Sequence, residues 1–167
     1  QGGNLETMAK STGLLLVELS SIFANIKPDY VITVADRHET LATAIAASYM
    51  NIPLIHTQGG ELTGSIDESV RHAITKLSHI HFPATKMAKK NIIQMGENPK
   101  NIFLTGCPSI NLIEEYKSNK KKFYPKNFDN LGVGYQIELD KKYLVVMYHP
   151  VTNEYKKNKE TIKNLLN

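Results

Sequence analysis

Apolar and polar positions follow two alternating patterns over the first two thirds of the chain. Short runs rich in β-branched and apolar residues predict strands, and the longer segments between them carry apolar residues at helical spacing. We expect strands at 30–35, 53–58, 79–84 and 101–106, and helices at 5–26, 39–50, 65–78 and 85–96. Strands that alternate with helices of this length are typical of βα units, which build a parallel sheet through right-handed crossovers.

Two of these segments carry more detailed signals. The run YVITVA at 30–35 is apolar at successive positions, so it predicts a strand that is buried on both faces of the sheet. At the start of the helix at 65–78, Ser65 is followed three residues later by Glu68. This spacing has the form of a capping box, in which the two side chains bind the first free backbone N–H groups of the helix.

The pattern changes after residue 118. A lysine-rich stretch with poor periodicity runs to about Asp140, and a new apolar run at 142–150 predicts a strand before a helix in 153–167. We therefore expect an α/β domain at 1–118, a linker at 119–140 and the start of a second α/β domain at 141–167. Because both ends of the chain fall inside this pattern, we interpret it as an internal piece of a larger protein.

Composition excludes several classes of protein. The chain is 41% hydrophobic and 22% charged, which is ordinary for a globular domain. We find no apolar run long enough to cross a membrane and no targeting leader. The one cysteine, Cys107, leaves no intramolecular disulfide and no cysteine-rich zinc site, and it fits a reducing compartment. We expect a cytoplasmic protein without a metal site.

The net charge of +4 is unevenly distributed. The first 75 residues carry eight acidic and four basic side chains, so the basic excess lies in the remainder. Many of these bases fall in 117–127, where Lys, Asn and Pro favour a solvated linker. Few aromatic residues alternate with them to stack on bases. We therefore expect no nucleic-acid partner.

Unusual polar residues gather at the ends of the predicted strands. In an open parallel sheet, ligands bind beyond the carboxyl ends of the strands. A solvated helix face does not explain charges that are confined to these positions, so we expect a functional site there. The candidate residues are Asp36, Arg37, Gln58, Gly59, Gly60, Glu61, Asp67, Arg71 and, at the end of the last predicted strand, His149.

Several of these residues have a structural alternative. Gly59 and Gly60 either form a turn with positive φ or let a ligand approach the backbone, and the chain has neither GxGxxG nor GxxxxGK[ST] to favour a nucleotide by itself. We interpret His79, His81 and Cys107 as packed or surface residues.

The helix at 65–78 leaves a second choice open. Arg71 and His72 lie one turn after Asp67 and Glu68, where side chains on one helix face meet. They either pair with those carboxylates or contact a ligand. Glu68 is interpreted as a helix cap rather than as an acid–base group.

The segment VADRHETLATAIAASYMNIPLIHTQGGELTGSIDESVRHAITKLSHIHF (34–82), with TGCPS and YHPVT further on, resembles the hydrolysing UDP-N-acetylglucosamine 2-epimerases. The resemblance extends over essentially the whole chain. It implies a Rossmann-like parallel sheet with flanking helices, within a two-domain glycosyltransferase-B-like architecture. Residues 1–118 would then be the C-terminal portion of the N-terminal domain, and 141–167 the start of a UDP-binding domain, with the substrate between the two domains.

The resemblance also implies a reaction. Such enzymes eliminate UDP from the sugar to give a 2-acetamidoglucal and then add water to give the free 2-epimer. Asp36 and Asp67 match carboxylates with acid–base or sugar-positioning roles, whereas Arg37 and His149 match residues that contact UDP. We assign catalysis to Asp36, Asp67 and His149, and substrate binding to Arg37, Gln58, Gly59, Gly60, Glu61 and Arg71. Many members of the family have a glutamate where this chain has Gln58, and an amide cannot take a proton.

The implied partner is a UDP-sugar, and no cofactor is expected because elimination and hydration need no hydride carrier. The sugar is UDP-N-acetylglucosamine or a 2,4-diacetamido analogue, for sialic or legionaminic acid synthesis. We expect a homo-oligomer, and no turnover from this piece alone. The alternatives are a non-hydrolysing epimerase, a glycosyltransferase of similar fold, and a non-catalytic nucleotide-sugar-binding remnant.

Overall fold

The computed structural model describes residues 5–118, 141–149 and 158–166. The chain forms two compact units, Gln1–Ile110 and Asn111–Asn167, which are described separately. The predicted linker at 119–140 lies outside the described residues, as do residue 150 of the last predicted strand and residues 153–157 of the last predicted helix. The domain limits at 118 and 140 therefore stay predictions.

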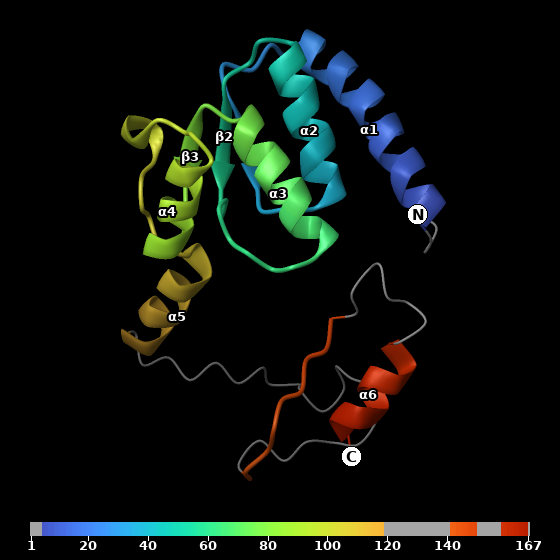
Figure 1. Cartoon of the computed structure of the whole chain (residues 1–167), viewed down its shortest axis with the longest axis vertical. Coiled ribbons are helices and arrows are strands. Elements are labelled where there is room, and N and C mark those ends of the chain that lie inside the picture. The colour runs from blue at the N-terminus through green and yellow to red at the C-terminus, as the bar shows by residue number, and fades with distance from the viewer. Residues whose placement is uncertain (1–4, 119–140, 150–157, 167) are drawn as a thin grey trace. The chain divides into compact units, whose positions relative to one another are not determined.

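A parallel three-stranded sheet with helices forms the first unit (Figure 1). The strands follow the order β1-β2-β3, and α2 lies between α1 and α3. This arrangement confirms the predicted α/β class. The elements are α1 (Leu5–Ile26), β1 (Val31–Val34), α2 (His38–Tyr49), β2 (Leu54–Thr57), α3 (Ile66–Leu77), β3 (Ile80–Phe82) and α4 (Lys86–Gln94).

One face of the sheet forms the core. In the parallel register Val31 lies opposite Leu54 and Thr33 lies opposite His56, and all four side chains are buried. The next register pair, His56 and His81, continues this face into β3. Alanines cover the strands from α2, where their small side chains allow the helix to approach closely. They are Ala42, Ala44, Ala46 and Ala47.

The opposite face of the sheet differs from the prediction. The side chains of Ile32 and Val34 are 63% and 53% exposed, although the sequence predicts a strand buried on both faces. Three strands in sequential order explain the difference. Right-handed crossovers between neighbouring strands place their helices on the same side of a sheet. Within the described residues, these helices therefore cover a single face.

The strand predicted at 101–106 is also wrong in extent. A 3₁₀ turn occupies Pro99–Asn101, and α5 begins at Pro108. Between them a single parallel bridge joins Ile102 to His81, and the Phe103 N–H donates to the His81 carbonyl at 2.9 Å. The partner strand β3 ends at Phe82, so few positions lie opposite this segment to form a ladder of hydrogen bonds.

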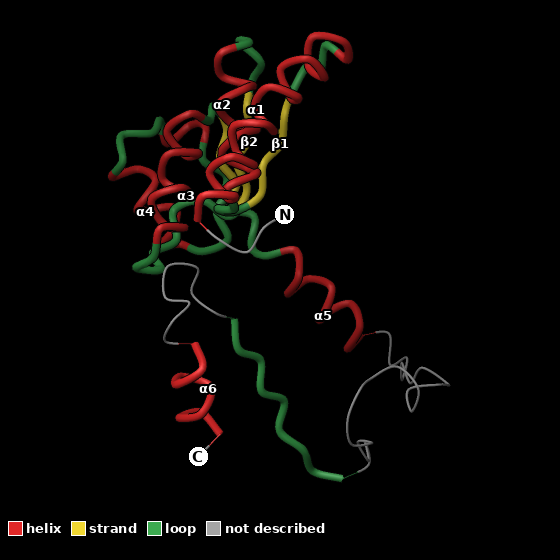
Figure 2. The backbone as a smooth tube through the Cα atoms, turned by 90° about the vertical axis from the view of Figure 1, so that its right-hand side faces the viewer, coloured by secondary structure: helices red, strands yellow, loops and turns green. Residues whose placement is uncertain are grey.

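The described part of the second unit contains most of α5 (Pro108–Ser118) and all of α6 (Asn158–Leu166). Residues 142–149, predicted as a strand, form an extended loop (Figure 2). A strand is stabilised by hydrogen bonds to a neighbour, and within the described residues none pairs with this segment. No helix in the described ranges is both long and apolar enough to cross a membrane.

Candidate active site

Two strained residues end β1 and β2. Ala35 and Gln58 both have φ of 58°, in the left-handed region that costs a residue with a Cβ about 1–2 kcal/mol. Each N–H still extends the sheet: Ala35 donates to the Thr57 carbonyl and Gln58 to the Phe82 carbonyl, both at 3.0 Å. The chain therefore turns sharply after its last sheet hydrogen bond. These turns place Asp36 and Gly59 at the same edge of the sheet.

Arg71 connects the two turns from α3. Its side chain is buried, with 3% of the residue exposed, and its Nη2 pairs with Oδ2 of Asp36. Its Nη1 donates to the Glu61 carbonyl at 2.6 Å. The Asp36 side chain is 21% exposed, so solvent reaches part of the carboxylate. An ion pair with so buried a guanidinium fixes the carboxylate more strongly than a surface pair does.

This pairing corrects one alternative from the sequence. Arg71 bonds to Asp36 on the β1 turn and not to a carboxylate one turn back on its own helix. His72 does lie near its helix neighbour, with Nε2 at 3.9 Å from Oε1 of Glu68. The predicted contact of Arg71 with substrate remains a prediction.

A second cation, Arg37, is largely exposed, with 73% of its side chain accessible. Its guanidinium binds both carboxylate oxygens of Glu39, at 2.9 and 3.1 Å. This contact raises the pKa of Arg37, and the nearby charges of Asp36 and Asp67 raise it further. The same hydrogen bond lowers the pKa of Glu39. Arg37 thus lies in the field of both predicted catalytic carboxylates.

Asp67 and Glu68 begin α3, where negative charge is favoured by the helix dipole. Oδ2 of Asp67 accepts from the Ser65 hydroxyl at 3.3 Å. Oε2 of Glu68 accepts from the N–H groups of Gly64 and Thr63, at 2.7 and 2.6 Å, and these bonds lower its pKa. Glu68 therefore caps the residues before the helix. The predicted capping box is wrong in detail, because the Ser65 side chain makes no cap bond.

Gly59 and Gly60 are both buried, and protein atoms fill the space beside them. A Cβ on Gly59 would lie 2.8 Å from Nδ1 of His56, and one on Gly60 would lie 2.3 Å from the Ala88 carbonyl oxygen of α4. Gly60 also has φ of 81°. Packing alone explains why glycine is present at both positions. Contact of these residues with a ligand stays a prediction.

Gln58 is half-buried, and its Nε2 donates to the Cys107 sulfur at 3.8 Å. Cys107 is likewise partly buried, as the sequence predicts for a packed residue. His149 is exposed in the second unit, and its predicted catalytic role remains a prediction. Among the residues that the structure describes, no group of three His, Cys, Asp or Glu side chains is suited to hold a metal ion.

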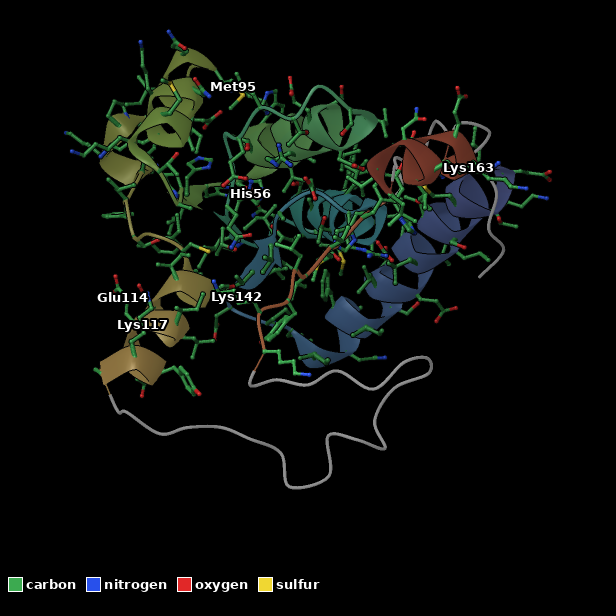
Figure 3. The ribbon with its side chains drawn as sticks, turned by 90° about the horizontal axis from the view of Figure 1, so that it is seen from below. His56, Met95, Glu114, Lys117, Lys142 and Lys163 are labelled. Atoms are coloured by element: carbon green, nitrogen blue, oxygen red, sulfur yellow. The ribbon has the colours of Figure 1, made fainter. Side chains whose placement is uncertain are left out.

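Sequence reasoning missed His56, which lies inside the first unit (Figure 3). Its Nε2 is 2.9 Å from the Ala35 carbonyl oxygen, and its Nδ1 is 3.2 Å from Oγ1 of Thr75. Burial lowers the pKa of His56 to about 4. The alternation of Leu54 and His56 on one strand face was the available signal, because it places the histidine in the core next to the predicted site.

The chain matches the family model described as UDP-N-acetylglucosamine 2-epimerase over residues 1–167. A Legionella pneumophila protein named UDP-N,N'-diacetylbacillosamine 2-epimerase (hydrolyzing) is 42% identical over 89% of this chain and 37% of its own length. A Campylobacter jejuni protein named GDP/UDP-N,N'-diacetylbacillosamine 2-epimerase (hydrolyzing) is 37% identical over 96% of this chain and 40% of its own. The chain thus spans well under half the length of these relatives.

Solved structures show the same fold. The Neisseria meningitidis UDP-GlcNAc 2-epimerase bound to UDP-GlcNAc aligns with a TM-score of 0.61 and 26% identity, over 66% of this chain and 32% of that one. The Methanocaldococcus jannaschii UDP-GlcNAc 2-epimerase in complex with UDP-GlcNAc and UDP aligns with a TM-score of 0.63 and 26% identity, over 69% and 33%.

Proposed function

Since this chain belongs to the UDP-N-acetylglucosamine 2-epimerase family, we propose that it is part of a hydrolysing epimerase. The enzyme converts a UDP-N-acetylglucosamine-type sugar to UDP and the free 2-epimer. The observation that carries the proposal is that relatives with 42% and 37% identity, matched over 89% and 96% of the chain, are named hydrolysing 2-epimerases. Their names also favour the 2,4-diacetamido sugar, N,N'-diacetylbacillosamine, over N-acetylglucosamine as the substrate.

The reaction has two steps. A base removes the C2 proton while the bond between C1 and the UDP oxygen breaks, which gives UDP and a 2-acetamidoglucal. Water then adds its oxygen to C1, and C2 receives a proton on the opposite face. The first step needs a carboxylate and a cation for the leaving diphosphate, and the second needs an acid and a base.

The described geometry supports the roles of Asp36 and Asp67. Asp36 uses Oδ2 for its ion pair with Arg71, so the carboxylate is held in one orientation. In this proposal the other oxygen, Oδ1, is the one that takes the proton. Asp67 accepts a hydrogen bond from the hydroxyl of Ser65, the N-cap residue of the same helix. In this proposal the two carboxylates carry the proton transfers, and Gln58 binds a sugar hydroxyl.

Arg37 suits the leaving group. Its guanidinium is exposed, and among the described residues Glu39 is the side chain that holds it, through two hydrogen bonds. A diphosphate offers the same two-oxygen geometry with more negative charge than a carboxylate. We propose that UDP replaces Glu39 on Arg37 and that His149 has a role in binding UDP.

Product analysis tests the reaction. A full-length protein that contains this chain is incubated with UDP-N,N'-diacetylbacillosamine and with UDP-N-acetylglucosamine, in D₂O and in H₂¹⁸O. We expect UDP and a free 2-epimer with deuterium at C2 and ¹⁸O at C1. A UDP-linked epimer would establish the non-hydrolysing alternative. Consumption only in the presence of a sugar acceptor would establish a glycosyltransferase.

Substitutions test the residue roles. Asp36→Asn and Asp67→Asn are each expected to lower kcat by about 10²–10⁴-fold, since each removes a proton-transfer group. Asp29→Asn is the matched control, because Asp29 is exposed just before β1. Near-wild-type turnover in both active-site variants would refute the assignment. We also propose that the 167-residue chain alone has no turnover, and measurable product from it would show otherwise.

A further inference from the structure

His56 touches three parts of the chain that carry the proposed site. Its Nε2 meets the Ala35 carbonyl, one residue before Asp36, at 2.9 Å. A carbonyl oxygen only accepts hydrogen bonds, so Nε2 carries the proton. Its Nδ1 meets the Thr75 hydroxyl on α3 at 3.2 Å. The imidazole therefore connects the β1 turn to the helix that carries Arg71.

Thr75 extends the connection. Its Oγ1 lies 3.0 Å from the Arg71 carbonyl oxygen, one helical turn back. The hydroxyl proton has two acceptors, that carbonyl and the unprotonated Nδ1 of His56. Gly59 packs against a third side of the imidazole. A Cβ at this position would lie 3.0 Å from Oγ1 of Thr75 and closer still to the imidazole. The ring thus has one position, defined by β1, α3 and the turn after β2.

The contacts of His56 affect the orientation of Asp36. Ala35 has a left-handed φ of 58°, and both of its backbone polar groups are used: the N–H by Thr57 and the carbonyl by His56. Such a conformation persists only where surrounding contacts determine it. The direction of the following residue, Asp36, depends on it. Arg71, held on the same helix as Thr75, completes the placement of the Asp36 carboxylate.

We propose that His56, with Thr75, is a positioning residue for the reaction: it holds the Ala35 turn and thereby the orientation of Asp36 toward substrate. The inference rests on the proposed function, since it presumes that Asp36 takes part in proton transfer. His56 acts in its neutral form. Burial disfavours the charged ring most, and His81 on β3 and Arg71 on α3 disfavour it further, whereas the hydrogen bond to the Ala35 carbonyl and the charge of Asp36 favour it.

The kinetic test uses three substitutions in a full-length protein that contains this chain. His56→Leu removes the bond to Ala35, and we expect kcat to fall about 10²-fold, as for other small misplacements of a catalytic group, with KM within threefold. His56→Gln keeps an amide N–H that is able to reach the carbonyl, and we expect it to recover at least tenfold of that loss. His81→Leu, the control for a buried histidine on the same sheet face, should change kcat by less than threefold.

Unchanged kcat in His56→Leu would overturn the proposal, and so would an equal loss in His81→Leu. If His56→Leu does not fold, His56→Gln decides: kcat within tenfold of wild type supports the inference, and a loss of 10²-fold or more opposes it.

A spectroscopic test does not depend on turnover. In protein labelled with ¹⁵N at histidine, the His56 signals are assigned by their loss in His56→Gln. We expect the neutral Nε2–H form from pH 7 down to pH 5, and an Nδ1–H form or an imidazolium in that range would overturn the inference. If no UDP-sugar is consumed but the Nε2–H form is present, the proposed function has failed and the geometry of His56 has not.

Discussion

Two buried histidines lie side by side on the covered face of the sheet and have different surroundings. His56 on β2 and His81 on β3 are register partners, and they are 0% and 1% exposed. Both nitrogens of His56 have hydrogen-bond partners. Neither nitrogen of His81 has one among the described residues, although Nε2 lies 3.4 Å from a carboxylate oxygen of Glu97.

The partners explain the difference. The His56 cluster, which comprises His56, Ala35, Thr75, Arg71 and Asp36, is held by backbone atoms of β1 and α3. In the His81 cluster, which comprises His81, Glu97 and Lys76, the carboxylate pairs with a half-exposed lysine that also donates to the Met95 carbonyl at 3.2 Å. Burial alone therefore does not make a histidine a positioning residue. An imidazole can orient its neighbours when its own hydrogen-bond partners are held in place, and of these two clusters the His56 cluster meets that condition.

Removing the cation from each cluster should give the largest difference. Arg71→Met leaves a partly buried Asp36 carboxylate and the Glu61 carbonyl without their partner, and we expect a loss of about 3–5 kcal/mol in the free energy of unfolding. Lys76→Met removes a half-exposed ion pair and should cost less than about 1 kcal/mol. Urea denaturation followed by circular dichroism measures both. Equal losses would show that the two clusters do not differ as described.

A smaller effect is expected at Gly60, where the turn after β2 packs against α4. Gly60→Ala places a Cβ 2.3 Å from a backbone oxygen and imposes a left-handed φ on alanine. We expect a loss of about 3 kcal/mol, from overpacking and strain together. Gly64→Ala is the matched control, because its φ is 70° but nothing lies within 4 Å of the added Cβ. It should cost about 1 kcal/mol, and a similar cost at both sites would exclude the contact with α4.

The smallest expected effect is the contribution of His56 to the pH dependence of the free energy of unfolding. The pKa of His56 is about 4 in the folded chain and about 6.5 in an unfolded one. As pH falls from 6.5 toward 4, the unfolded state takes up a proton that the folded state does not, so stability falls. Between pH 7 and pH 5 we expect His56 to account for a loss of about 2 kcal/mol.

His56→Gln should lack this contribution, so the difference in stability between wild type and variant should shrink by that amount on going to pH 5. The pKa of His81 is also lowered by burial, and His81→Gln should reduce the pH dependence in the same direction. A pH dependence that is unchanged in His56→Gln would show that its ring is not kept neutral by folding.

Much of the first unit was predictable from hydrophobic pattern. The strands at 30–35, 53–58 and 79–84 are present, as are the helices between them, because period and turn residues act over a few neighbours. The segments at 101–106 and 142–149 also contain apolar runs, and neither forms a full strand. Strand formation depends on a neighbour to accept its hydrogen bonds, and local pattern does not report whether one is present.

The predicted strand ends also indicated where the candidate site would lie. They did not indicate which side chains there contact one another. That Asp36 and Asp67 follow successive strands was visible in the sequence. The pair between Asp36 and Arg71 spans 35 positions, so helix spacing favoured a nearer carboxylate instead. His56 was missed because its role comes from what surrounds it, and a histidine within an apolar run is by itself a core residue.

The sequence alone determined the order of βα units, the family and the edge of the sheet at which polar residues gather, because these depend on local period and on motifs that are contiguous in the chain. The tertiary structure decided which carboxylate pairs with Arg71, that Gly59 and Gly60 are required by packing, and which of two buried histidines is fixed. Each of these depends on distances between atoms far apart in sequence, which only the folded chain brings together.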